Sequence, residues 1–506
     1  MSTFAAIDVG SNAMRMAIGR FDARGKLNII ATCRAAVRLG RDVFRTGKIS
    51  PGIMEQGVAA FVEFETMLLE YKVSRYRAVA TSALRDATNG SEFIKRVERA
   101  TGIAVEVISG DEEARLVYRA VAHNVPLKRG TNLLLDIGGG SCEVSLCDRG
   151  DIIFAESVNM GTVRLLEMVR GTPKSQPLLE RLIRQYARRV RARLQSIKHH
   201  GRISKIIGTG GNIDTLGELR KEVLGESSSR ILRRTELRQL LSTVSAMTIQ
   251  QRINRLGLRP DRADVIVPAM TLLLGIMEEV GVATLAIPKT GLRDGVLHDL
   301  HAESATWSAR NLLRRQFAQV RVGALELGRH YKFDETHAVH ATRLALQIFD
   351  QTKRVHRLGN ESRAVLEVAS LLHDVGYYIN SFDHQKHSAY IIRSSALVGL
   401  TPEQRMMVSL AARYHRGAAP SEKDDNYGQL DARDRRVVRI VAAIIRLVED
   451  LDREHSQRIK KVRVVCRGKK LRIVLPPSRS LLVEKWGLEN HKKPLEDALR
   501  VSIDIA

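Results

Sequence analysis

Two patterns of apolar and polar residues divide the chain. Over the first three hundred residues, short apolar runs such as 4–7 and 133–135 are separated by longer amphipathic stretches. Short apolar runs predict strands and longer amphipathic stretches predict helices, so their alternation predicts an α/β fold. From about residue 306 the strand-like runs disappear. The spacing of apolar residues over 363–372 and 437–451 then predicts a helical domain.

The last part of the chain changes again. A polar stretch over 417–435 predicts a surface loop, and apolar runs within 462–475 and 481–483 predict a small strand-containing unit. The 506 residues, 44% of them hydrophobic, are enough for several cores, because single cores stop growing at roughly 250–300 residues. We therefore expect two to four domains.

The sequence predicts neither export nor insertion into a membrane. The longest apolar stretch, 265–277, contains Pro268 and falls short of the ~20 residues that a spanning helix needs. Asp8 interrupts the apolar start at 4–7, which also lacks the basic segment of a signal peptide. The 4 cysteines show no paired spacing. We expect a soluble, cytoplasmic protein.

The formal net charge of +25 favours a polyanionic partner. Nucleic acid, a phosphate polymer and an anionic membrane all meet that description. Aromatic residues make up only 5% of the chain and do not interleave with basic ones, as they do where bases stack. A nucleic-acid-binding module is therefore the weaker explanation. Many arginines, such as those in 181–193, are expected simply to solvate helix faces.

Three glycine-rich segments, each directly after an apolar strand, have the pattern of phosphate-binding loops. Glycine lets successive backbone N–H groups approach phosphate oxygens, and serine, threonine and asparagine add side-chain donors. The phosphate-binding residues predicted in these segments are Gly10, Ser11, Asn12, Gly138, Gly139, Gly140, Ser141, Gly208, Thr209, Gly210, Gly211 and Asn212.

An aspartate ends the strand before each of the first two loops. Asp8 and Asp136 would repel a phosphate group unless a divalent cation lay between them, so they predict a metal site. Mg²⁺ is the expected ion, although another divalent cation would serve.

The Asp-x-Gly loops at 8–10 and 136–138 resemble the pair that faces across a cleft in the actin-like phosphotransferase superfamily. The resemblance implies an α/β fold of duplicated ribonuclease H-like lobes, the ASKHA architecture, with an interlobe cleft. Together with the patterns above it gives lobe I at 1–125, lobe II at 126–305, an all-α HD-like domain at 306–458 and a small α+β unit at 459–506.

Longer stretches resemble one family of that superfamily. Residues 108–116 and 136–143 are similar to the exopolyphosphatase and guanosine pentaphosphate phosphohydrolase family. The similarity continues through 80–87, 160–165, 208–212 and 291–295, so it spans the whole two-lobed region. The departures are Ala13 and Cys142, where the family usually has a hydroxyl residue, and Asp294, where glutamate is common.

This resemblance implies a site for phosphoanhydride hydrolysis. It places the base that acts on the attacking water at Glu113 and the metal ligands at Asp8, Asp136 and Glu143. The neighbouring Glu112 is expected to point elsewhere on its helix.

Two arginines in the similar stretches can contact phosphate. Arg85 and Arg164 suit a phosphate ligand and a structural ion pair equally well. Arg85 is the one included in the predicted phosphate site.

The helical domain carries a second set of candidate ligands, which resembles the HD phosphohydrolase pattern. Histidine and aspartate from several helices can converge on a metal that activates water. The possible second metal site comprises His337, His373, Asp374 and Asp452, and the remaining histidines of the pattern are His340, His384, His387 and His415. Alignment of 446–452 puts Glu449 at the final ligand position. In related exopolyphosphatases such a site is often degenerate, and the domain extends the polymer path and supports a dimer. We expect those roles here.

Together, the sequence patterns and the family resemblance predict an exopolyphosphatase. Such an enzyme releases terminal orthophosphate from inorganic polyphosphate with Mg²⁺, and we expect it to form a homodimer. The alternative within the fold is hydrolysis of guanosine pentaphosphate at its 5′-terminal phosphate. An inactive polyanion-binding scaffold is the alternative from another class, but the presence of Glu113, Asp136 and Glu143 argues against it.

Overall fold

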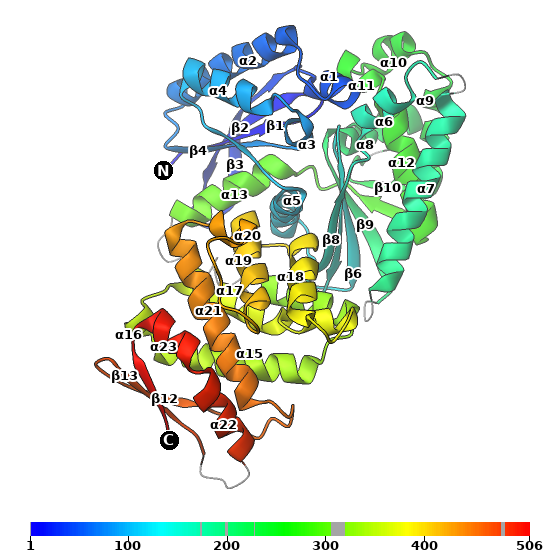
Figure 1. The fold of residues 1–506 in the computed structure, drawn as a ribbon. Helices are drawn as coiled ribbons and strands as arrows, with labels where there is room; N and C mark the ends of the chain where they lie inside the picture. The colour runs from blue at the N-terminus through cyan, green and yellow to red at the C-terminus, as the bar shows by residue number, and fades with distance from the viewer. Residues whose placement is uncertain (1, 173–174, 198–200, 227, 305–318, 477–480) are drawn as a thin grey trace. The chain divides into compact units, whose positions relative to one another are not determined.

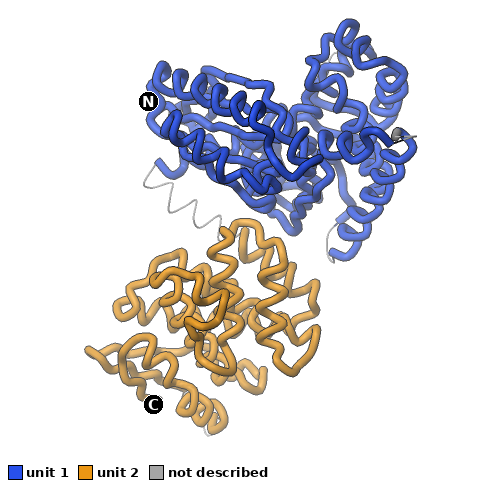
Figure 2. The backbone as a smooth tube through the Cα atoms, turned by 45° about the horizontal axis from the view of Figure 1, so that its top comes forward, with its two compact units in different colours: residues 1–315 blue, residues 316–506 orange. Residues whose placement is uncertain are grey.

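The computed structural model describes residues 2–172, 175–197, 201–226, 228–304, 319–476 and 481–506. The chain folds as two compact units, Met1–Arg315 and Gln316–Ala506 (Figure 2). The predicted boundary between 305 and 306 lies outside the described residues. Among the described helices, none combines the length and apolar character needed to cross a bilayer.

The first unit contains two sheets, and the first of them forms lobe I (Figure 1). Its strand order is β3-β2-β1-β4-β5, in which β1 pairs antiparallel with β2 and parallel with β4. The central β1 is buried along nearly its whole length, as its continuous apolar run predicts. The elements of this lobe are β1 (Phe4–Val9), β2 (Met14–Phe21), β3 (Leu27–Ala35), α1 (Leu39–Thr46), α2 (Pro51–Glu70), β4 (Arg75–Ala80), α3 (Ser82–Asp86), α4 (Gly90–Thr101) and β5 (Val105–Val107).

The second sheet repeats this plan in lobe II. Its order is β10-β11-β9-β6-β7-β8, with β6 antiparallel to β7 and parallel to β9. In each lobe an Asp-bearing central strand is thus followed by an antiparallel neighbour, which confirms the predicted duplicated, actin-like α/β fold. The elements are β6 (Thr131–Ile137), β7 (Cys142–Asp148), β8 (Asp151–Val158), α6 (Thr162–Val169), α7 (Ser175–Ser196), β9 (Ile203–Thr209), α8 (Gly211–Leu224), β10 (Ile231–Arg233), α9 (Arg234–Ser245), α10 (Ile249–Leu256), α11 (Pro260–Ala263), α12 (Ile266–Val280) and β11 (Thr284–Ala286).

Two helices are exchanged between the lobes. Helix α5 (Gly110–Asn124) follows lobe I in sequence but packs on β7 and β8 of lobe II (Figure 1). Helix α13 (Leu292–Ser304) follows lobe II but packs on β1 and β2 of lobe I. The two helices also pack on each other, and Asp299 of α13 forms ion pairs with Arg115 and Arg119 of α5. The sequence boundary at 125/126 therefore does not separate the packed lobes.

The second unit is helical and ends in a small sheet of order β12-β13-β14. Apolar residues of this terminal part, such as Leu488 and Ile503, belong to the same core as Val441 and Leu447 of the long helix α21. The predicted segments 306–458 and 459–506 thus share one core. The elements are α15 (Glu335–Gln351), α16 (Lys353–His356), α17 (Asn360–Leu372), the 3₁₀ helix η1 (Val375–Tyr378), α18 (His384–Ser394), α19 (Pro402–Arg413), α20 (Asp425–Gly428), α21 (Ala432–Leu451), β12 (Arg463–Arg467), β13 (Lys470–Val474), α22 (Leu482–His491), α23 (Lys493–Leu499) and β14 (Ser502–Ile505).

The crossing of α5 and α13 predicts a stability defect in Gly295→Ala. A Cβ at Gly295 would overlap the backbone carbonyl of Leu116, so the helices would have to move apart. Overpacking of this kind costs about 1–3 kcal/mol, and we expect thermal unfolding to show a melting temperature lower by several degrees. Gly52→Ala is the matched control, because nothing lies within 4 Å of its Cβ position. Equal melting temperatures for the two variants would contradict the tight crossing.

Candidate active site

The three glycine-rich loops converge on one cavity of the first unit. Its lining comes from the β1–β2 turn, the β6–β7 turn, the start of α8 and the segment that leads into α13. The lining residues that the argument uses are Asp8, Ser11, Arg15, Glu113, Asp136, Gly139, Gly140, Gly210, Gly211, Arg262, Lys289 and Arg293. The predicted loops of the two lobes therefore face a common space.

The first two loops lie against each other. A Cβ at Gly139 would lie 3.3 Å from the backbone nitrogen of Asn12, and one at Gly140 would lie 2.6 Å from Ser11 Oγ. A side chain in place of Gly140 would therefore push the lobes apart, whereas one in place of Gly139 would need its neighbours to shift slightly. Ser11 Oγ is buried and has no hydrogen-bond partner among the described residues, which leaves a donor for a bound ligand.

The third loop begins helix α8. Gly210 has a φ of 98°, which favours glycine, and Gly211 is the first helical residue, so backbone N–H groups of the helix N-terminus face the cavity. The two residues before them have other roles. Gly208 packs against Leu285, and Thr209 donates its hydroxyl to Asp136 Oδ1 at 2.8 Å. Neither of these two is among the lining residues of the cavity.

The asparagines of the first and third loops line the cavity, but their side chains bind protein groups. Asn12 Nδ2 donates to the carbonyl of Asp261 at 2.9 Å, and its Oδ1 accepts from Arg38 at 2.7 Å. Asn212 Oδ1 accepts from Arg262 at 2.6 Å. These amides hold the loops in position and leave the backbone N–H groups for phosphate.

Three carboxylates gather at one side of the cavity. Asp136 is the last residue but one of β6, and Glu143 stands opposite it on β7, so the antiparallel register makes them a pair. Glu113 reaches them from the first turn of α5, which Ser109 caps by accepting from the backbone of Glu112. One oxygen from each of the three carboxylates lies within 4.8 Å of the others, and all three residues are buried.

Burial raises the pKa of each of these carboxyl groups. The pKa of Glu113 stands well above its usual value because of burial and the charge of Glu143. The same two causes raise the pKa of Asp136 to about 7. Arg85, whose Nη1 lies 3.0 Å from Glu113 Oε2, is the cation paired with this group. Three buried carboxylates beside one arginine favour a divalent cation with oxygen ligands, such as Mg²⁺.

Asp8 lies apart from the three-carboxylate group, although it lines the same cavity. It stands opposite Arg15 in the register of β1 and β2. Burial raises the pKa of Asp8, and the charges of Arg15 and Arg293 oppose that rise. As a predicted metal ligand it would therefore reach the ion from the lobe I side.

The predicted phosphate ligand Arg85 and the alternative candidate Arg164 both make protein contacts. Arg85 donates to the carbonyl of Ile108 at 2.8 Å and pairs with Glu113. Arg164 donates to the carbonyl of Gly140 at 2.8 Å, pairs with Asp86 and lies over the Phe44 ring. Arg164 thus joins the lobes as a structural cation, and Arg85 holds the predicted base. Neither is among the cavity-lining residues.

Other cations, which the sequence analysis did not single out, line the cavity instead. A Cβ on Gly211 would lie 2.7 Å from Arg15 Nη2 and even closer to Arg262 Nη2. Both guanidinium groups therefore contact the third loop. Burial, and then the charge of Arg15, lower the pKa of Arg262 to about 9. Arg15 alternates with the buried Met14 and Met16 in β2, so it lies on the opposite face of the sheet, and this alternation was the sequence signal that could have found it.

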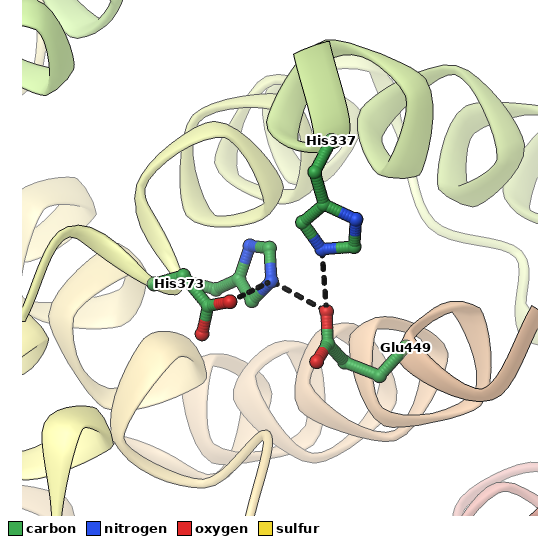
Figure 3. Close-up of side chains that lie close together, drawn as sticks. His337, His373 and Glu449 are labelled. Carbon is green, nitrogen blue, oxygen red and sulfur yellow. Dashed lines mark hydrogen bonds and ion pairs between the residues drawn. The ribbon is translucent and has the colours of Figure 1, made fainter. Parts of the chain in front are cut away.

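The second unit brings most of the predicted HD-like residues together (Figure 3). Glu449 Oε1 lies 3.0 Å from His337 Nε2 and 2.6 Å from His373 Nε2, and Asp374 completes the group. Asp452 takes a different place, since its Oδ2 contacts the far nitrogen of His337 at 2.9 Å. Glu449 therefore stands where the prediction placed Asp452.

The carboxylates around His337 favour a positive charge at this position. Burial lowers the pKa of His337, but hydrogen bonds to Asp452 and Glu449 outweigh it and raise that pKa to about 10. His340 and His387 lie outside the group.

The actin-like lobes, the phosphate-binding loops and the carboxylate group define a hydrolase that acts on phosphoric anhydrides. The chain belongs to the Ppx/GppA phosphatase family, whose model matches residues 18–304. The model of Ppx/GppA phosphatase domain III matches residues 321–493. The family predicted from the sequence is thereby confirmed.

Individual relatives carry two kinds of name. A guanosine-5′-triphosphate,3′-diphosphate pyrophosphatase of Aeromonas hydrophila subsp. hydrophila is 28% identical over 410 residues, which cover 80% of this chain and 79% of the relative. A crystal structure of the Aquifex aeolicus family member matches with a TM-score of 0.51 and 28% identity, over 60% of this chain and 98% of the other. An exopolyphosphatase from Cytophaga hutchinsonii matches with a TM-score of 0.54 and 25% identity, over 59% and 97%.

The raised pKa of Asp136 predicts a stability that depends on pH and on divalent cations. In metal-free protein the folded state binds the Asp136 proton more tightly than the unfolded state, so its contribution to stability falls as the pH rises from about 4 to about 7. We expect Mg²⁺ to raise the melting temperature more at pH 8 than at pH 5. In Asp136→Asn the difference between the two pH values should shrink, and an unchanged difference would contradict the assignment. Thermal unfolding in EDTA and in Mg²⁺ provides the measurement.

Proposed function

We propose that the protein is an exopolyphosphatase, which releases terminal orthophosphate from inorganic polyphosphate with Mg²⁺ or another divalent cation. The observation that carries this proposal is a basic groove continuous with the cavity. The groove shares Arg15, Gly211, Asp214, Lys289 and Arg293 with the cavity lining. It therefore continues the path of any phosphate chain whose end lies among the loops.

The charge of the groove fits a linear polyanion. Its lining contains five cationic side chains, Arg15, Arg34, Arg259, Lys289 and Arg293, against the two carboxylates Asp214 and Glu218. Some of this charge is compensated, because Arg34 and Arg259 both pair with Asp261 and Lys289 pairs with Glu218. The remaining excess attracts further phosphate groups of a long chain.

The cavity offers little to a purine base. Among the described residues, the linings of the cavity and the groove include no phenylalanine, tyrosine or tryptophan on which a base could stack. This favours polyphosphate over guanosine pentaphosphate. Guanosine pentaphosphate is the second candidate substrate, because the Aeromonas relative is named for it.

In this proposal, residues of this chain carry out each part of the hydrolysis. Glu113, held by Arg85, accepts the proton of the attacking water as the water oxygen bonds to the terminal phosphorus. The bridging P–O bond breaks, and its electron pair leaves with the shortened chain. Loop N–H groups and Arg262 fix the phosphate oxygens. Asp8, Asp136 and Glu143 would hold the divalent cation, which supplies charge neutralisation when bound. An inactive scaffold would not need this group of buried carboxylates.

Glu113→Gln is expected to lower kcat for polyphosphate about 10²–10⁴-fold, the usual worth of a general base. The amide keeps the size of the side chain but cannot accept the proton. Phosphate release from polyphosphate, tripolyphosphate and guanosine pentaphosphate gives the measurement. Glu112→Gln is the matched control and should retain most of the activity, since Glu112 pairs with Arg115 and Arg77. Full activity in Glu113→Gln would exclude this residue as the base.

Arg259→Ala should raise KM for long polyphosphate about two- to fivefold, because one exposed charge contact contributes this much to binding. Arg259 lines the groove but not the cavity, so KM for tripolyphosphate should stay unchanged. The control is Arg188→Ala, which removes an exposed arginine from α7. Equal changes with long and short substrates would show that the groove does not bind the distal chain.

A further inference from the structure

Exposed aromatic rings gather on one part of the unit Gln316–Ala506. Six aromatic side chains of the described residues are exposed, and four of them, Tyr377, Tyr378, Phe382 and Tyr390, belong to η1, α18 and the turn between them. Phe382 is 78% exposed and Tyr390 is 60% exposed. Single apolar side chains at a surface are ordinary, whereas a group of them marks a place where another molecule binds.

Helix α18 presents one of these rings between two cations. Lys386, Tyr390 and Arg393 are four and three residues apart, so they lie on one face of the helix. All three are exposed, and all three line a pocket on that face. Cation, ring and cation therefore alternate along the helix. The aromatic content of the whole chain, 5%, gives no sign of this local arrangement.

The other wall of the pocket comes from α19 and α20, which follow α18 in the fold (Figure 1). Arg413 and Tyr414 end α19 and line the pocket. Tyr414 is buried and donates its hydroxyl to Asp424, which holds the ring in place. The guanidinium carbon of Arg413 lies 5.7 Å from the centre of that ring. The wall thus offers a further cation on a fixed support.

The arginines of the pocket have no acidic partner. Neither Arg393 nor Arg413 forms an ion pair or a side-chain hydrogen bond with any residue that the structure describes, whereas Lys386 pairs with the carboxylate three residues before it. The lining holds these three cations against the carboxylates of Asp424 and Asp425, and the first of these already accepts from a tyrosine. Two unpaired guanidinium groups are therefore available to an anion such as a phosphate group.

We propose that this face of α18, together with its pocket, binds single-stranded nucleic acid. Phosphate groups of the strand pair with Lys386, Arg393 and Arg413. One base stacks on Tyr390, and Phe382 offers a second exposed ring just before the helix. Cations that follow the backbone beside exposed rings are the elements by which proteins hold single strands without regard to sequence.

The exposed rings distinguish this ligand from other polyanions. Inorganic polyphosphate has no bases, so Tyr390 and Phe382 would add nothing to its binding. In a duplex the bases stack on one another, and only unstacked bases are free to stack on side chains. The lining of the pocket also shares no residue with the basic groove of the proposed function or with the histidine-containing groups of the second unit. The inference is therefore independent of the proposed function.

Fluorescence anisotropy of a short labelled oligothymidylate, with the full-length protein and no added metal, tests the proposal. We expect binding at near-physiological salt, and Tyr390→Ala should weaken it about tenfold because stacking on one base is lost. Trp486→Ala is the matched control, because Trp486 is also 60% exposed but lies on α22, and it should bind as the unmodified protein does. Arg393→Ala should weaken binding and lower the slope of log affinity against log salt by about 0.7, the contribution of one phosphate contact.

An abasic strand of the same length separates stacking from charge. It should bind the unmodified protein about tenfold more weakly than the oligothymidylate, and this difference should shrink in Tyr390→Ala. Equal affinity for the two strands, or equal binding by Tyr390→Ala and the unmodified protein, would overturn the proposal. So would the absence of binding, and sedimentation would then show whether Tyr390→Ala dissociates an assembly in which the rings contact a second copy of the chain. Melting temperatures confirm that each variant is folded.

Discussion

Helix α5 carries Glu113 from the end of lobe I to the sheet of lobe II, and the active site depends on this crossing. Glu113 meets Asp136 and Glu143 only because α5 packs on β7 and β8. Helix α13 makes the reciprocal crossing, and the absent side chain at Gly295 lets the two helices touch. The exchange therefore fixes two carboxylates of lobe II and one from lobe I side by side in a single packed unit.

Like charges lie close together on both sides of the cavity and repel each other. On one side, burial and then the charge of Glu143 raise the pKa values of Glu113 and Asp136, so protonation or a cation must relieve the repulsion. On the other side, Arg15 and Arg262 lie together, and the pKa of Arg262 is lowered. A ligand that carries negatively charged oxygens together with a divalent cation would relieve the repulsion on both sides at once.

The two units bring together candidate cation ligands of different kinds. The first offers carboxylates alone, which suit hard ions that keep their water. The second adds four imidazoles, each held through its far nitrogen, which suit transition metals. In the second group, Glu449 and Asp452 are three residues apart near the end of α21 and so face the same side. Glu449 contacts Nε2 of His337 and of His373, whereas Asp452 contacts Nδ1 of His337.

The sequence alone determined the α/β alternation and the three glycine-rich loops, because strand periodicity and glycine patterns are local properties. The duplication of the lobes and the candidate roles of Glu113 and Glu143 were predicted from the resemblance to a family. The sequence did not determine where the boundaries between lobes fall, since the exchange of α5 and α13 is a matter of packing between distant segments. Arg262 and Arg293 escaped notice because single arginines carry no pattern in a chain with 81 lysines and arginines. The choice of Glu449 over Asp452 likewise awaited the tertiary structure, because both lie on one helical face and only the neighbouring helices decide which carboxylate reaches the histidines.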